Sequence, residues 1–350
     1  MANHNQKRGG ETAMKVYEVL KGGQSMDALR QGERPDPEPG PGQVLIRVRA
    51  CSMNYRDLAV VRGVYLGGPV QRDTIPLSDG AGEVAAVGAG VTRFKVGDRV
   101  AGTFFQGWID GAPPLTRAAL GSPLDGMLAE YVALSEDGVV AIPPSISFED
   151  AAAIPCAGVT AWNALMLTGR PLRPGDTVLC LGTGGVSIWA LQIAKAAGAR
   201  VIITSSSDEK LARAKALGAD EGVNYAARPD WDKAVLELTG GAGVDHVVEV
   251  GGVGTLGRSY QVVGFQGKIA LIGLLTREPG ELGPHALMWK AASLHGVFVG
   301  NRVMFEQLNR AIETSRIKPV IDKVFPFERA ADAFAYQGSG SHFGKIVISV

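Results

Sequence analysis

The sequence predicts an α/β protein in which a doubly wound parallel sheet of six strands is joined to a second, mostly antiparallel β domain. The chain has 350 residues, a length typical of two domains. Short strand-like segments separated by Gly and Pro dominate up to about residue 144. From about Ser145, apolar strands alternate with helical patterns, and such alternation is typical of a parallel sheet.

In the first region, the apolar segments are short and bounded by turn residues, which favours strands over helices. We expect strands at 15–20, 43–54, 82–88, 98–104, 128–134 and 139–143. Residues 55–62 have room for one or two helical turns. The same texture returns in the tail, where we expect a helix at 304–312, a strand at 323–327, a helix at 329–335 and a last strand at 345–350.

The second region opens with a helical stretch at 147–169. Pro155 interrupts it, because proline has no backbone N–H to donate. Ser147, with Asp150 three positions later, has the spacing of a helix N-cap. Six strands follow at 177–182, 200–205, 222–225, 244–250, 267–274 and 293–300. The last of them is expected at an open edge of the sheet, where two subunits could pair.

A glycine turn between the first of these strands and its helix has the context of a dinucleotide-binding fingerprint. Gly182 makes the tight turn, and Gly184 lets the backbone approach a pyrophosphate. The amides near Gly185 and Val186 then point at the anion from the helix start. Ser187 stands at the third position, where the fingerprint has Gly, so an ordinary strand-to-helix turn is the alternative. The strand that follows the helix completes a βαβ unit and favours the cofactor interpretation.

Composition excludes several classes of protein. The net charge of +0 gives no electrostatic support to a nucleic-acid or anionic-membrane partner. No apolar run approaches the length of a membrane span, and no signal-peptide pattern opens the chain. Three cysteines give no disulfide framework, so we expect a cytoplasmic protein. Residues 1–13 are polar and are expected to be a disordered leader.

Six motifs taken together resemble the medium-chain dehydrogenase/reductase superfamily, in its zinc-free quinone or enone reductase form. They are MNYRDL at 53–58, SDGAGEVAAVG at 78–88, VGDRV at 96–100, PCAGVTAW at 155–162, GTGGV at 182–186 and HFGKIVI at 342–348. The resemblance implies a GroES-like catalytic domain over residues 14–150, completed by 302–350. It implies a Rossmann dinucleotide-binding domain over 151–301, with the substrate between the two domains beside the nicotinamide.

The zinc positions of this family are altered. Zinc-dependent relatives carry cysteine at the position of Asn54, a His-Glu pair at Ser78 and Asp79, and cysteine at Cys156. A catalytic zinc needs three ligands drawn from Cys, His and carboxylate. We therefore expect no metal site, and Cys156 is interpreted as a packing residue. The structural zinc lobe is also absent, because residues 104–128 contain no cysteine.

The end of the second strand bears on the choice of cofactor. Ser205 stands where an NAD-specific enzyme has Asp or Glu, so a ribose phosphate is not repelled. Ser206 and Lys210 offer that phosphate a hydroxyl and a charge, and Lys210 matches a phosphate-binding lysine of quinone reductases. Alternatively, Ser206 only caps its helix and Lys210 is a solvated helix residue. We expect NADPH to be preferred over NADH.

Three further residues match cofactor contacts of the family. Tyr225 matches an adenosine-side tyrosine, or it packs at the end of its strand. Thr160 matches a nicotinamide contact, or it hydrogen-bonds its own helix backbone. Lys345 could approach the cofactor, but a charged residue before a strand needs no such role, and we give it little weight.

Asn54 and Tyr65 are the expected catalytic residues. The Asn54 amide can orient the carboxamide or a substrate carbonyl without a metal; the alternative is a structural asparagine in a turn. Tyr65 matches a tyrosine at the substrate site of quinone reductases, and a phenol is protonated and able to donate at neutral pH. Asp57 is expected to pair with an arginine, and His246 to be a core residue.

The resulting hypothesis is a zinc-independent, NADPH-dependent oxidoreductase that passes hydride to a quinone or an activated alkene. An alcohol dehydrogenase or carbonyl reductase using the same cofactor is the first alternative. A non-catalytic nicotinamide-binding protein, structural or RNA-binding, is the second. The expected partners are a small-molecule substrate and a second copy of the chain, paired through residues 293–300.

Overall fold

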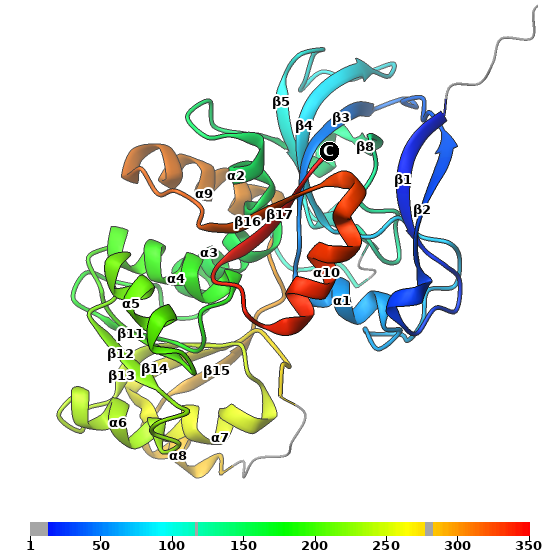
Figure 1. The fold of residues 1–350 in the computed structure, drawn as a ribbon. Helices are drawn as coiled ribbons and strands as arrows, with labels where there is room; N and C mark the ends of the chain where they lie inside the picture. Colours follow the sequence, from blue (N-terminus) through cyan, green and yellow to red (C-terminus); the bar gives the residue numbers. More distant parts are fainter. Residues whose placement is uncertain (1–12, 116–117, 277–282) are drawn as a thin grey trace, which may run out of the picture.

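The computed structural model describes residues 13–115, 118–276 and 283–350. The expected leader therefore lies outside the described residues, apart from residue 13, which begins the first strand. Two large sheets organise the molecule (Figure 1). The longest helix of the tail, α9 (Arg302–Ser315), contacts β9 (Val139–Ala141) of the first sheet and α3 (Val159–Trp162). The predicted α/β class, a mostly antiparallel β domain joined to a parallel sheet of six strands, is confirmed.

The first sheet has seven strands and is mostly antiparallel. Its order is β16-β17-β3-β4-β5-β9, and β8 pairs with β3. The strands are β3 (Gln43–Ser52), β4 (Asp79–Val87), β5 (Arg99–Gly102), β8 (Tyr131–Ser135), β9 (Val139–Ala141), β16 (Ile321–Pro326) and β17 (Lys345–Ser349). The chain's last strand, β17, lies antiparallel to β3, so the tail completes the sheet that the N-terminal region begins.

Two short pairs accompany this sheet: β1 (Ala13–Val19) with β2 (Leu29–Pro35), and β6 (Phe105–Gln106) with β7 (Ala118–Ala119). The sequence analysis missed β2. Its segment LRQGERP is polar and mostly exposed, so it lacks the apolar alternation that reveals a strand, and its pairing with β1 holds it in place.

The second sheet has six parallel strands in the order β12-β11-β10-β13-β14-β15. They are β10 (Thr177–Cys180), β11 (Arg200–Ser205), β12 (Glu221–Asn224), β13 (Val244–Glu249), β14 (Val263–Leu271) and β15 (Ser293–Gly296). Helices α4 (Gly185–Ala196), α5 (Asp208–Ala216), α6 (Trp231–Leu238), α7 (Val253–Val262) and α8 (His285–Trp289) connect them. The strand predicted at 293–300 ends earlier, at Gly296, and it does lie at an edge of this sheet.

The expected long helix at 147–169 is divided into four pieces. They are α2 (Phe148–Ala152), a π-helical turn (Ile154–Gly158), α3 (Val159–Trp162) and a second π-helical turn (Asn163–Leu167). The first π turn begins just before Pro155, which cannot continue the regular hydrogen-bond pattern. Ser147 caps α2 as predicted, accepting a 3.1 Å hydrogen bond from the amide of Asp150. Helix α2 contacts β3, β4 and β17, whereas α3 contacts α4 and α9.

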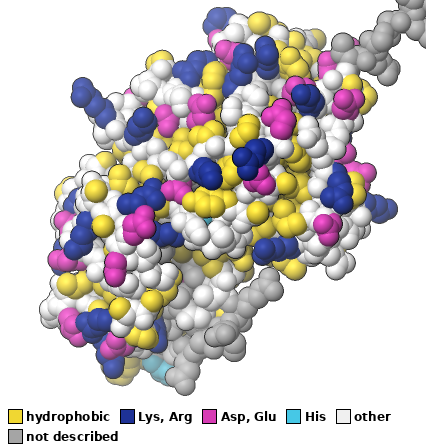
Figure 2. Space-filling view, in the orientation of Figure 1, with side chains coloured by type: hydrophobic (Ala, Val, Ile, Leu, Met, Phe, Trp, Pro, Cys, Tyr) yellow, Lys and Arg dark blue, Asp and Glu magenta, His cyan; other side chains and the backbone are white. Residues whose placement is uncertain are grey.

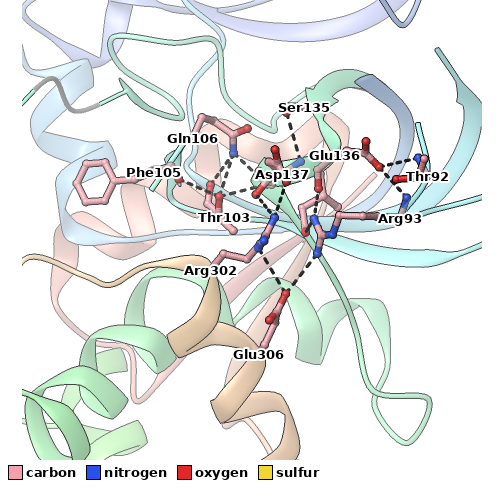
Figure 3. Close-up of polar contacts among 12 residues, drawn as sticks. Thr92, Arg93, Thr103, Phe105, Gln106, Ser135, Glu136, Asp137, Arg302 and Glu306 are labelled. Carbon is pink, nitrogen blue, oxygen red and sulfur yellow. Dashed lines mark hydrogen bonds and ion pairs between the residues drawn. The ribbon is translucent and has the colours of Figure 1, made fainter. Parts of the chain in front are cut away.

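Helix α9 is tied to the first sheet by ion pairs, shown in Figure 3. Arg302 Nη1 lies 2.7 Å from Oδ1 of Asp137, and Arg93 Nη2 lies 3.3 Å from Oε1 of Glu306. Arg302 Nε lies 3.5 Å from the same Glu306 oxygen. Both arginines thus share Glu306. The Arg93 pair connects α9 to the loop after β4, and the pair of Arg302 with Asp137 connects it to the turn after β8.

One hydrophobic core spans the two sheets. It joins Ala50, Ala81 and Val347 of the first sheet to Val178 and Ile203 of the second. A second core fills the body of the first sheet, and a third lies under α6 and α7. Within the described residues, no helix is both long and apolar enough to cross a membrane.

Candidate active site

The glycine turn lies between β10 and α4. Gly182 has φ +71°, a conformation that favours glycine, and Gly184 is the N-cap of α4 without any side-chain cap. The first amides of α4, at Gly185 and Val186, therefore have no side-chain acceptor at the cap, as an anion-binding helix start requires. The Ser187 hydroxyl turns inward and donates a 2.6 Å hydrogen bond to the carbonyl of Leu181.

The end of β11 lies next to this turn, since the Gly182 amide donates to the Thr204 hydroxyl at 3.1 Å. Ser205 is buried and Ser206 is exposed. The cap of α5 is Ser207, whose hydroxyl accepts from the amide of Lys210, so the alternative role given to Ser206 as the helix cap is wrong. The extended backbone conformation of a helix N-cap is adopted by Ser207, one position later than Ser206.

Lys210 and Tyr225 both follow the strand ends near Ser205: Lys210 is in the first turn of α5, after β11, and Tyr225 comes directly after β12. The Lys210 ammonium donates a 2.8 Å hydrogen bond to the carbonyl of Gly340, in the turn that ends α10 (Ala330–Ser339). The Tyr225 amide donates to the carbonyl of Ser205 at 2.9 Å, and its side chain is exposed. The structure thus brings Tyr225 to Ser205 at the carboxyl end of β11, while the Lys210 ammonium lies against the turn after α10.

Asn54 is the centre of a buried polar constellation. It is the N-cap of α1 (Tyr55–Val61), and its amide nitrogen Nδ2 donates to the Ser78 hydroxyl at 3.3 Å. Ser78 in turn donates to Oδ1 of Asp79 at 2.7 Å. The other oxygen of Asp79 accepts the backbone N–H of Cys156 at 3.1 Å. The position of Asn54 in a cap is therefore structural, while its side chain faces the positions that correspond to zinc ligands in the resemblance.

Lys345 is the residue of this site that sequence reasoning undervalued. It is the first residue of β17, and its side chain is only 3% exposed. Its ammonium lies 2.7 Å from Oδ1 of Asn54, hydrogen-bonds the carbonyl of Met53, and lies 3.8 Å from Oδ2 of Asp79. The only available signal was the motif HFGKIVI, because its partners lie almost 300 positions away in the sequence.

The glycine turn and Lys345 are in direct contact. Gly344 donates its amide to the Thr183 carbonyl at 2.9 Å, and Gly344 forms a bridge with Gly184. A Cβ atom placed on Gly185 would lie 2.8 Å from Cδ of Lys345. Glycine at position 185 therefore leaves room for the lysine stem to pass from the glycine turn to Asn54.

Arg56, Asp57 and Tyr65 form the flank of the constellation. As expected, Asp57 pairs with an arginine, since its Oδ1 lies 3.3 Å from Nη1 of Arg56. Its Oδ2 accepts a 2.8 Å hydrogen bond from the backbone N–H of Asn54. Burial raises the pKa of Asp57 to about 6, although the Arg56 charge acts in the opposite direction. The Arg56 guanidinium lies 4.6 Å from the centre of the Tyr65 ring. Burial also raises the pKa of Tyr65, so its phenol is a proton donor rather than a phenolate.

Thr160 lies on α3, beside the same constellation through Cys156. It is buried, and its hydroxyl donates a 2.6 Å hydrogen bond to the carbonyl of Cys156. This is the hydrogen bond to its own helix backbone that the alternative interpretation of Thr160 predicts. It leaves the hydroxyl oxygen able to accept a bond, so a role toward the nicotinamide stays a prediction.

A zinc ion does not fit these residues. The three positions offer an amide, a hydroxyl and a thiol, at Asn54, Ser78 and Cys156. Burial, with the Asp79 charge, raises the pKa of the Cys156 thiol well above its usual range, and the Lys345 ammonium already lies among these groups. In the part of the chain that the structure describes, no three His, Cys, Asp or Glu side chains are grouped to hold a metal.

Two surface hollows, of about 540 and 450 Å³, lie elsewhere. The first lies between α4 and residues 315–321, and the second lies at the amino-terminal end of the parallel strands, around 238–245. Neither contains Asn54, Lys345 or Tyr65. We place the site at the constellation because buried charges and the glycine turn meet there, whereas the hollows have no such grouping.

Comparisons with known proteins show the family to which the chain is similar. A model of the alcohol dehydrogenase GroES-like domain matches residues 40–144, and a model described as zinc-binding dehydrogenase matches 185–314. A zinc-type alcohol dehydrogenase-like protein of Schizosaccharomyces pombe is 42% identical over 343 residues, covering 96% of this chain and 98% of the relative. A quinone oxidoreductase of Sus scrofa is 32% identical over 331 residues, covering 93% and 94%. A solved NAD-dependent alcohol dehydrogenase superposes with a TM-score of 0.88 at 36% identity, covering 96% of this chain and 100% of that one.

Proposed function

This chain belongs to the medium-chain dehydrogenase/reductase superfamily and is an oxidoreductase of that type, and from that premise we propose that it is a zinc-independent, NADPH-dependent reductase of quinones or activated alkenes. One observation carries the proposal: the positions of the catalytic zinc hold Asn54 and Ser78, which are linked by hydrogen bonds to Asp79 and Lys345. Hydrogen-bond donors at this place can polarise a carbonyl, which a metal would otherwise do.

The residues have separate roles. The bound nicotinamide supplies a hydride. The glycine turn at Gly182 and Gly184 and the amides of Gly185 and Val186 would hold the pyrophosphate. Asn54 orients the substrate or the carboxamide, and Thr160 contacts the nicotinamide side. Tyr65 donates a proton, since burial raises the pKa of its phenol and keeps it protonated.

The preference for NADPH is supported by charge. No carboxylate stands at Ser205, whose side chain is buried beside the glycine turn. Ser206 is exposed, and Lys210 lies four positions later, in the first turn of α5. The Lys210 ammonium would exchange the Gly340 carbonyl for the ribose phosphate, which is the stronger acceptor. Tyr225 would lie against the adenosine.

An alcohol dehydrogenase or carbonyl reductase is the second candidate. It is favoured by the names of the relatives, among them the NAD-dependent alcohol dehydrogenase, which also makes NADH the competing cofactor. The non-catalytic alternative has less support, because a glycine turn beside buried ionisable groups is typical of an active site.

We further propose a cytoplasmic homodimer that binds a small molecule and neither nucleic acid nor a membrane. The described cysteines are all free, which suits a reducing compartment. Charges of both signs are interspersed over the face drawn in Figure 2, so this face has no basic stripe for nucleic acid. Exposed apolar residues flank the open edge at β15: Leu294 on the strand itself, and Met288 and Trp289 on α8. A second copy would cover them by pairing edge to edge.

The test is a substrate panel. Purified protein is incubated with NADPH or NADH and with enones, quinones, aldehydes or, in the oxidised direction, simple alcohols. We expect NADPH oxidation with enones or quinones at a kcat/KM at least tenfold above that for aldehydes. The reverse ranking favours the second candidate. NADPH binding without turnover on any member of the panel favours the non-catalytic alternative.

A further inference from the structure

Lys345 is a buried ammonium whose hydrogen bonds are incomplete. An ammonium has three N–H donors. Two of them bind the carbonyl oxygens of Met53 and Asn54. The third has no acceptor within hydrogen-bond distance among the described residues, because the nearest carboxylate oxygen, on Asp79, is 3.8 Å away. The group is 3% exposed, so water is largely excluded from it.

The surrounding residues hold this ammonium in place. Its attraction to Asp79 compensates part of the cost of burying the charge. A buried ion pair is stable only if both partners also have hydrogen bonds. Asp79 receives these bonds from the Ser78 hydroxyl and the Cys156 amide. The Asn54 oxygen then fixes the direction of one N–H.

The position of Lys345 connects the two halves of the site. Its stem passes Gly185 at the start of α4, where the pyrophosphate binds in the proposed function. Its ammonium ends beside Asn54, where a catalytic metal stands in zinc-dependent relatives. A positive charge at that point is in the right place to meet an oxygen of the substrate that becomes negative during hydride transfer.

We propose that Lys345 is a catalytic residue, whose ammonium binds and polarises the carbonyl oxygen of the substrate in the place of a metal. This inference rests on the proposed function. With an enone, hydride adds to the β-carbon, the alkene π electrons form a double bond between the α-carbon and the carbonyl carbon, and the carbonyl π electrons move to the oxygen, giving an enolate. The Lys345 ammonium donates a hydrogen bond to that oxygen without losing its proton. Protonation of the α-carbon by Tyr65 gives the saturated ketone, and water restores the Tyr65 phenol.

A purely structural role is the competing explanation, and another lysine provides the matched control. Lys268 is equally buried, and its ammonium donates a 2.6 Å hydrogen bond to the carbonyl of Thr168. It lies on β14, away from Asn54 and Tyr65. Lys345→Met and Lys268→Met remove the same charge from equally buried places, so only an effect specific to the site distinguishes them.

The first measurement compares kinetics, NADPH affinity and thermal stability for both variants, on the best substrate of the panel. We expect Lys345→Met to lower kcat by about 100- to 1000-fold, the usual loss when one oxyanion-binding donor is removed. Lys268→Met is expected to keep kcat within about threefold, and the NADPH dissociation constant is expected to change less than about fivefold in either variant. If both variants lose kcat equally, or Lys345→Met keeps it within about threefold, the proposal is overturned.

The second measurement needs no turnover. 4-Nitrophenol mimics an enolate, and its visible absorbance distinguishes bound phenolate from bound phenol. With NADP⁺ present, we expect wild type and Lys268→Met to bind it as the phenolate, with affinity at least tenfold above that of Lys345→Met. Lys345→Arg is expected to bind it weakly, because the planar guanidinium cannot place its N–H in the same direction. If Lys345→Met does not fold, Lys345→Arg is measured in its place. Equal phenolate binding by wild type and the Lys345 variants overturns the proposal, even if the wild type reduces none of the panel and the proposed function itself fails.

Discussion

Nζ of Lys345 lies 2.7 Å from Oδ1 of Asn54, although 291 positions separate the two residues in the chain. The contact depends on the antiparallel pairing of β17 with β3, in which Val347 is opposite Ser52. The same strand begins at the glycine turn, through the bridge of Gly344 with Gly184. The last strand of the chain therefore joins the expected nucleotide site to the expected catalytic site.

Purified protein should contain no stoichiometric zinc. Asn54 and Ser78 are poor zinc ligands, and the Lys345 ammonium repels a dication from the same place. Elemental analysis should find far less than one zinc per chain, and prolonged dialysis against a chelator should leave the activity unchanged. Zinc near one per chain, lost together with activity on chelation, would show that this argument is wrong.

Lys210→Ala should weaken NADPH binding about tenfold to a hundredfold, because one charge-assisted hydrogen bond to phosphate contributes roughly 1.5–3 kcal/mol. NADH binding should hardly change, since NADH has no phosphate at the ribose. Ser205→Asp should shift the preference towards NADH by repelling the phosphate and binding the ribose hydroxyls. Fluorescence titrations of both cofactors measure these effects.

Lys215→Ala is the matched control for the cofactor titrations. Lys215 is exposed on the same helix and lies in its last turn, away from the Ser207 cap. It should leave both affinities unchanged. Equal losses of NADH and NADPH affinity in Lys210→Ala would assign the lysine to the fold or the pyrophosphate instead.

Leu294→Lys should convert the proposed homodimer into a monomer. In a two-fold edge-to-edge pair, the same strand approaches from both subunits, so two lysines would face each other across the interface. Leu294 is 37% exposed on β15. The control is Val96→Lys. Val96 is 60% exposed and lies between β4 and β5 of the first sheet. Sedimentation velocity at micromolar concentration checks this, and a wild-type monomer would count against the interface.

The two partners of one ion pair should differ in their effect on stability. Arg302 has a side-chain exposure of 15%, whereas Asp137 is 51% exposed. Arg302→Met removes bonds to both Asp137 and Glu306 and should lower the free energy of unfolding by about 1–3 kcal/mol. Asp137→Asn should lower it by less than about 1 kcal/mol, since an exposed partner rehydrates. Urea denaturation measures both, and equal losses would contradict the importance of Arg302 as the shared link.

The contribution of His246 to stability should decrease as the pH falls from about 6.5 to about 4. Burial lowers the pKa of His246 to about 4 in the folded protein, although Asp176 opposes the shift, while the unfolded value is 6.5. Over this range the unfolded chain binds the proton first, so acid favours unfolding, by up to roughly 3 kcal/mol. His246→Gln, which keeps a donor for Asp176, should have a shallower pH dependence in urea denaturation. A slope identical to that of wild type would exclude His246 as the cause, leaving His342, whose pKa burial also lowers to about 4.

Much of the fold could be predicted because its signals are local. The apolar run at 178–181, the glycine turn and the helix that follows appear in the structure as β10, Gly182–Gly185 and α4. The capping of α2 by Ser147, and the strands of the tail, likewise depend on residues only a few positions apart. Such features follow from periodicity and capping, which a single sequence contains.

The sequence by itself determined the two kinds of sheet, the glycine turn at 182–185, and the presence of Asn54 and Ser78 at positions where the resemblance has zinc ligands. Only the tertiary structure decided that Lys345 lies among them. It also decided that Gly185 must lack a side chain for that lysine to pass. The physical reason is that a charged residue before a strand looks the same whether its side chain reaches solvent or a buried carboxyl group. The register of β17 against β3 and the packing of the sheets against each other set its direction, and these are contacts between residues far apart in the chain.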